Sequence, residues 1–173
     1  MKKYAIPIFL AGTLLMIYIM SRTGASLKTP ATPLGILNLE FAYDTAKTSV
    51  VMNAWAPSNN MDNIAVAKLN TWVDFLFIFF YSFFFFFACS KIAETFRGQF
   101  ANAGRLIAKG ALLAGLFDIV ENAGMLLTLY GYSSGIIAFL TVAFSIMKWG
   151  LVIIAVLYVL AGLLSWAFHK FKD

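Results

Sequence analysis

Five polar or ionisable side chains interrupt otherwise apolar stretches of the chain, and they are the clearest candidates for chemistry. They are Asp74, Asp118, Glu121, Asn122 and Lys148. A charge at the centre of a bilayer costs at least ~3 kcal/mol on insertion scales, so such groups need partners. Asp118 and Glu121 are one helical turn apart, and a single lysine can neutralise only one of them. Either the other carboxyl stays protonated, or a cation, a proton path or a cationic ligand completes the site.

The rarest residue types exclude several other kinds of site. The chain has one cysteine, Cys89, and one histidine, His169. One cysteine excludes an intramolecular disulfide and any chemistry that needs a cysteine pair. One histidine leaves too few ligands in the chain for a bis-histidine haem or a zinc site with several histidines. There is no Gly-rich phosphate loop and no Ser-x-x-Lys or His-Glu pair. The sequence therefore indicates no catalytic residue and no metal site, and it leaves any cofactor unknown.

The composition is that of a membrane protein. The chain has 173 residues, of which 61% are hydrophobic and 12% are charged, against roughly half and about a quarter in soluble domains. Its net charge of +5 is spread over loops beside apolar stretches, which is typical of the positive-inside rule. Because the basic residues form no stripe with interleaved aromatic residues, a nucleic-acid partner is not expected.

Four apolar stretches are long enough to be membrane spans. They cover about 4–20, 72–89, 106–130 and 136–167. A backbone in lipid must satisfy its own hydrogen bonds, so each span is predicted to be a helix. The first also has the pattern of a signal peptide cleaved after Ala25, but we favour an uncleaved anchor. The predicted fold is an all-α four-helix transmembrane bundle that forms a single membrane domain over 1–173.

Lysine and arginine flank the spans asymmetrically. Residues 1–3 and 91–109 are basic, and Lys170 and Lys172 follow the last span, whereas acids nearly balance bases in segment 21–70. The positive-inside rule therefore predicts that both termini lie in the cytoplasm and that 21–70 lies outside. The loop at 130–134 is then a short outer turn.

The outer segment 21–70 is predicted to form an amphipathic lid. Its apolar part 35–41 is expected to lie against the membrane surface, and from Met61 a helical pattern runs towards the second span.

A short helix is predicted within this lid. Asp44 or Thr45 is placed to cap it, and it should end before Pro57. Five apolar residues lie on about one face of it: Ala46, Val50, Val51, Ala54 and Trp55. An indole favours the membrane interface, where its N–H stays hydrated, so Trp55 is expected there.

Helical spacing predicts that the intramembrane polar residues meet. One stripe on the third span contains Gly104, Ala108, Ala111, Gly115, Asp118, Asn122 and Met125, and one on the fourth contains Thr141, Ser145, Lys148, Val152, Ala155, Val159 and Gly162. Small residues allow close helix approach in lipid, so these stripes should face each other. Lys148 would then reach Asp118 or Glu121, and Tyr81 and Ser82 would hydrogen-bond to the same cluster.

The candidate ligand or ion residues are Asp74, Tyr81, Asp118, Glu121, Asn122 and Lys148. Two other interpretations stay open. The cluster can act only as a structural lock that sets the register of the bundle, or it can contact a second protein in the membrane. The aromatic run 83–87 on the second span likewise fits either a lipid-facing helix or a wall for an apolar ligand such as a quinone, carotenoid or acyl chain.

Several short motifs also occur in this order along the chain. They are Thr32-Pro33-Leu34-Gly35-Ile36 leading to Phe41, then Trp55, Asp74 and Tyr81, and finally Asp118-Ile119-Val120-Glu121-Asn122. The order resembles an uncharacterised family of small bacterial four-span membrane proteins, over about 30–130. The resemblance implies the bacterial plasma (inner) membrane and carries no function.

Three classes of function remain. The first is a non-enzymatic accessory subunit, or a binding module for a lipid or a small apolar ligand, in a membrane complex. The second is a small proton- or cation-coupled transporter that uses the Asp/Glu/Lys cluster, for which a homo-oligomer is expected. The third is a lipid-modifying enzyme with Asp118 or Glu121 as general base, which ranks last because no nucleophile is apparent. Membrane lipids are expected partners in each case.

Overall fold

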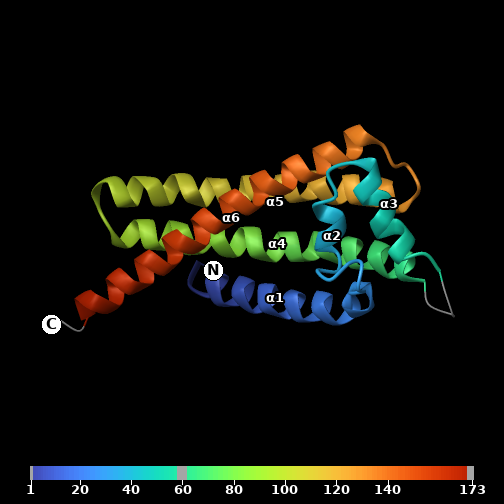
Figure 1. Ribbon diagram of the computed structural model, residues 1–173. Helices are drawn as coiled ribbons and strands as arrows, with labels where there is room; N and C mark the ends of the chain where they lie inside the picture. Colours follow the sequence, from blue (N-terminus) through green and yellow to red (C-terminus); the bar gives the residue numbers. More distant parts are fainter. Residues whose placement is uncertain (1, 58–61, 171–173) are drawn as a thin grey trace.

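All regular elements are helices over the residues that the computed structural model describes, which are 2–57 and 62–170. In chain order they are α1 (Lys2–Thr23), the short 3-10 helix η1 (Ala25–Leu27), α2 (Leu37–Glu40), α3 (Thr45–Ala54), α4 (Asn63–Thr95), α5 (Gly98–Leu129) and α6 (Gly135–Lys170). Figure 1 shows the four long helices packed together, with α2 and α3 folded over one end. The predicted all-α fold is confirmed, while Met61 and Lys172 lie outside the described residues.

Among the residues that the structure describes, four helices are long and apolar enough to cross a membrane, so the chain is an integral membrane protein. They are Tyr4–Thr23, Asn63–Thr95, Gly98–Leu129 and Gly135–Ser165. At 1.5 Å per residue, the longest of these extends about 50 Å, more than the roughly 30 Å of hydrocarbon. The helices α4 and α5 begin before the predicted spans at 72 and 106, because a hydropathy pattern does not register the polar turns at a helix start. Asp62 caps α4 by accepting a hydrogen bond from the backbone N–H of Ala65 at 3.0 Å.

The small-residue stripe of α5 lies at the centre of the bundle. It meets the stripe of α6 at Asp118 and Lys148, as predicted, but it also faces α4 at Gly115 and Asn122. α5 packs against both α4 and α6, and every residue of its stripe is buried. A Cβ added at Gly104 would overlap the hydroxyl of Tyr158 on α6, and one added at Gly115 would touch Ser82 on α4. Glycine at these two positions is what allows the neighbouring side chains to approach.

Part of the aromatic run on α4 packs against α1. The ring of Phe9 lies 5.5 Å from the ring of Phe83 and 5.6 Å from that of Phe79, measured between centroids. A Cβ at Gly12 would overlap the ring of Phe80. This side of α4 is therefore a helix contact, and it holds α1 against the bundle.

The segment between α1 and α4 is folded onto the helix ends. Asp44 caps α3 by accepting a hydrogen bond from the backbone N–H of Lys47 at 2.7 Å, as the sequence predicts. The buried face of α3 differs in part from the expected one: Val51 is buried as expected, but Thr48 is buried too and Val50 is 55% exposed. Part of the segment covers the ends of α4 and α5 with its own apolar side chains.

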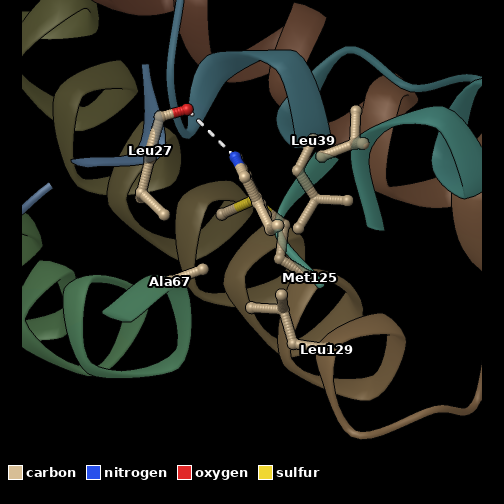
Figure 2. Packing of buried hydrophobic residues seen from close by; sticks show 7 residues of the cluster. Leu27, Leu39, Ala67, Met125 and Leu129 are labelled. Carbon is tan, nitrogen blue, oxygen red and sulfur yellow. Dashed lines mark hydrogen bonds between the residues drawn. The ribbon is translucent and has the colours of Figure 1, made fainter. Parts of the chain in front are cut away.

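Trp55 lies at the centre of this contact, and its predicted place at a hydrated interface is corrected. It is fully buried against Leu27, Leu39, Ala67, Met125 and Leu129 (Figure 2). Its Nε1–H donates to the carbonyl oxygen of Leu27 at 3.0 Å and to Oγ1 of Thr32 at 3.2 Å. These acceptors replace water, so the indole can be buried without an unpaired donor. The stretch around Leu39 likewise packs on α5 rather than standing apart from the bundle.

Candidate functional site

Lys148 on α6 is the centre of a buried charged cluster. Its Nζ lies 2.7 Å from Oε2 of Glu121, 3.1 Å from Oδ1 of Asp118 and 3.1 Å from Oε1 of Glu40. All four residues are at most 7% exposed. The predicted meeting of Lys148 with Asp118 or Glu121 is confirmed, and the lysine contacts both.

Glu40 is the member of the cluster that sequence reasoning missed. It is the last residue of α2, outside the predicted spans, and its Oε1 also accepts hydrogen bonds from Oγ of Ser145 and Nε1 of Trp149, both at 2.6 Å. A positive φ of 63° at Gly35 turns the chain into this short helix, a conformation that glycine adopts without strain. The sequence feature that could have indicated its burial is that Glu40 is a lone acid in the apolar stretch 36–42.

Tyr81 joins the cluster from α4. Its hydroxyl donates to Oδ2 of Asp118 at 2.7 Å, while Oδ1 of the same carboxylate accepts from Lys148. Both oxygens of Asp118 are therefore paired, which offsets the cost of burying that charge. Ser82, which was expected to join them, hydrogen-bonds instead to the carbonyl oxygen of Phe79 at 3.5 Å.

Asp74 and Asn122 form a second, incompletely paired group beside the first. Nδ2 of Asn122 donates to Oδ2 of Asp74 at 2.6 Å. Among the described residues, no lysine or arginine lies within 4.0 Å of Asp74. Oδ1 of Asn122 and Oε1 of Glu121 are buried without a hydrogen-bond partner. Oε2 of Glu121 has the ion pair with Lys148 as its contact, without hydrogen-bond geometry.

Two adjoining cavities border these groups. The larger, here called the polar cavity, has a volume of about 350 Å³, and its lining includes Glu40, Asp74, Asp118, Glu121, Asn122 and Lys148. The second, here called the apolar cavity, has a volume of about 270 Å³, and its lining includes Thr13, Phe77, Tyr81, Phe85 and Val152. Ile17, Phe77, Asp118, Lys148 and Trp149 line both.

The polar cavity extends from the spans to the segment folded over them. Residues of that segment, including Lys28, Gly35 and Leu37, form part of its wall. Lys28 is exposed and makes no ion pair with a described residue. Within the described part of the chain, four carboxylates and one buried lysine therefore surround a cavity whose upper wall is the folded segment.

The six predicted candidate residues are all brought to this one region, whereas Trp55 lies in the apolar contact above it. In the described ranges, no three His, Cys, Asp or Glu side chains are grouped so that they can hold a metal ion. Cys89 is buried and free. The chemistry that the arrangement offers is hydrogen bonding and charge, next to an apolar space.

Comparison of the chain with protein-family models, with curated proteins and with solved structures finds no match. The function is therefore inferred from the geometry of the site.

Proposed function

We propose that this protein is a non-enzymatic binding module that holds a small amphipathic molecule, such as a lipid, between its membrane spans. The observation that carries the proposal is the junction of a polar cavity with an apolar one through shared residues, among them Phe77 and Trp149. A molecule with a polar end and an apolar chain matches both spaces at once, and neither a purely polar nor a purely apolar molecule does.

The size and lining of the cavities support this proposal. Binding sites for small molecules usually measure about 300–1,000 Å³ and combine a mostly apolar wall with a few polar anchors. The volumes here are about 350 and 270 Å³. The aromatic rings of Phe77 and Phe85 on α4 supply the apolar wall, so part of the aromatic run is available to a ligand chain.

We further propose an orientation and a location. The distribution of lysine and arginine favours cytoplasmic termini and an outer position for the segment between α1 and α4, which would then act as a lid over the polar cavity. The resemblance in short motifs favours the bacterial plasma membrane. A ligand would enter from the outer leaflet or the outer solution, past the lid.

The second candidate function is proton- or cation-coupled transport. The imbalance between acidic and basic groups in the site favours it. Four carboxylates line the polar cavity against two lysines, the buried Lys148 and the exposed Lys28, and intramembrane charged groups often mark ion pathways. Purified protein in liposomes would then carry a proton or cation flux that Glu121→Gln abolishes. Flux equal to that of protein-free liposomes would eliminate this candidate.

The leading proposal is tested by native mass spectrometry of protein released gently from its own membranes. Val152→Trp is designed to fill the apolar cavity, because Val152 lines it. Ile153→Trp is the matched control, since Ile153 is 53% exposed on the next position of α6. We expect a reproducible small molecule on the wild type and on Ile153→Trp, and its loss from Val152→Trp.

Two other results would change the proposal. Bare chains in all three samples would contradict ligand binding at this site. A different protein bound at fixed stoichiometry would assign the chain as an accessory subunit, and loss of that protein from Glu121→Gln would place the charged cluster at the interface.

A further inference from the structure

Every unpaired polar atom beside the Asp74–Asn122 pair is a hydrogen-bond acceptor. Asn122 uses its amide nitrogen on Asp74, which leaves its Oδ1 with no partner, as is Oε1 of Glu121. Asn122 is 0% exposed and Glu121 is 1% exposed, so bulk water does not satisfy them. A buried acceptor without a partner destabilises the structure, and both residues line the polar cavity. A group that donates hydrogen bonds is what this wall lacks.

Among the described residues, Asp74 has no cation beside it, although both Lys148 and Lys28 line the polar cavity. Lys148 is shared among Glu40, Asp118 and Glu121, and no described cation pairs with Asp74. Asp74 is half-buried, so its carboxylate is accessible from the cavity. An unpaired carboxylate between membrane spans is costly, and a nearby positive charge stabilises it. The missing group is therefore a cation as well as a donor.

Metal ions fit this description poorly. The described residues contain no group of three His, Cys, Asp or Glu arranged around a common point, and Lys148 already occupies the space between three of the carboxylates. A protonated amine fits better, because its N–H groups donate to carboxylate and amide oxygens and its charge pairs with Asp74. The apolar cavity next to it accepts a hydrocarbon chain.

We infer that the site recognises the protonated amino group of an amphipathic amine, with its ammonium against Asp74 and Asn122 and its chain in the apolar cavity. This inference rests on the proposed binding function and specifies the ligand class. The shared chemistry is a primary ammonium on an apolar chain, whether it belongs to an aminophospholipid headgroup or to a free long-chain amine.

The test uses the full-length protein in nanodiscs of phosphatidylcholine and phosphatidylglycerol, which lack primary amines. Three probes carry the same dodecyl chain with a terminal diazirine, and they end in a primary amine, a trimethylammonium or an alcohol. Photolabelling as a function of probe concentration, followed by peptide mapping, reports both affinity and place. We expect the amine to label the neighbourhood of Phe85 and Val152, at concentrations about tenfold below those needed by the other two probes.

A substitution at Asp74 tests whether this residue pairs with the ammonium of the probe. Asp74→Asn should raise the half-labelling concentration of the amine by about tenfold and leave the alcohol unchanged. Glu94→Gln is the matched control, because the side chain of Glu94 is 62% exposed at the far end of α4. The comparison of the three probes on the wild type stands even if Asp74→Asn unfolds.

The outcomes separate the inference from the proposed function. Equal labelling of the cavity by all three probes overturns the inference and keeps the binding function. Labelling only of exposed positions outside the cavities, such as Leu157, or none at all, overturns both. If the trimethylammonium probe labels the cavity at the same concentration as the primary amine, recognition of the ammonium by hydrogen bonds is overturned. Competition by phosphatidylethanolamine nanodiscs supports the inference with a lipid source, and competition by added dodecylamine alone supports it with a free amine.

Discussion

Glu40 of α2 lies 3.1 Å from Lys148 of α6, and this ion pair joins the segment outside the predicted spans to the charged cluster between them. The same carboxylate oxygen accepts hydrogen bonds from Ser145 and Trp149. The segment between α1 and α4 and the charged cluster are therefore one structure, since the segment supplies one of the three carboxylates around the lysine. A substitution in either part is therefore expected to alter the structure or stability of the other.

Lys148→Met should destabilise the fold strongly. Glu40, Asp118 and Glu121 would lose their common cation, and breaking a buried ion pair from one side costs about 3–5 kcal/mol. Thermal unfolding in mild detergent, followed by circular dichroism, measures the change. Lys109→Met is the control, because Lys109 is exposed on α5 and pairs with no described acid. Equal melting temperatures for Lys148→Met and the wild type would contradict a stabilising role for the lysine.

Glu121→Gln should leave thermal stability unchanged or raise it, while ligand retention falls. Lys148 keeps Glu40 and Asp118 as partners, and the variant removes a buried charge whose Oε1 has no hydrogen bond. Residues that serve ligand binding are often not the ones that would stabilise the fold most. The melting temperature and the mass of any retained molecule are measured on the same sample. A loss of stability as large as that of Lys148→Met, with no change in retention, would favour the structural lock over the binding site.

Trp55→Phe should loosen the lid and leave the spans intact. The variant removes the donor to Leu27 and Thr32. Both acceptors keep another hydrogen bond, so the expected cost is that of one lost buried hydrogen bond, about 0.5–1.5 kcal/mol. Hydrogen exchange read by mass spectrometry should become faster in 25–57 and stay unchanged in α5. Trp72→Phe serves as the control, because Trp72 is 55% exposed. Unchanged exchange in 25–57 would show that the indole hydrogen bonds do not hold the lid.

Gly104→Ala and Gly110→Ala, both on α5, should have opposite effects. A Cβ at Gly104 would overlap the hydroxyl of Tyr158, whereas one at Gly110 meets only Leu151 Cδ2, at an ordinary 3.6 Å. Overpacking costs about 1–3 kcal/mol, while alanine in an open helix position gains up to about 1 kcal/mol over glycine. Melting temperatures of the two variants check this. A stable Gly104→Ala would mean that α5 and α6 have room to move apart.

The arrangement of the spans and most of the site followed from the sequence. Small residues at a spacing of three and four identified the buried faces of α5 and α6, because close approach in lipid requires them. The same spacing brought Asp118 and Asn122 onto one face and placed Lys148 opposite them. Depth along each helix then predicted that Tyr81 and Ser82 would hydrogen-bond to this cluster. Tyr81 does so, to Asp118 at 2.7 Å, and Ser82 does not.

Contacts made by the lid could not be predicted in the same way. Glu40 and Trp55 lie in a segment of short helices, where no long periodic pattern defines a buried face. Trp55 has the amphipathic character of an interfacial residue, and only the fold brings the Leu27 carbonyl to its N–H. Glu40 was counted among the outer charges, because its partner Lys148 is far away in the sequence.

The most direct test of ligand binding is a high-resolution structure of the protein purified from its own membranes. Amphipathic amine binding predicts continuous non-protein density from Asp74 and Asn122 to Phe85 and Val152, with a donor atom within hydrogen-bond distance of Oδ1 of Asn122. Cavities that hold only water, with Oδ1 of Asn122 and Oε1 of Glu121 bonded to it, would contradict that prediction and leave the charged cluster as a structural element.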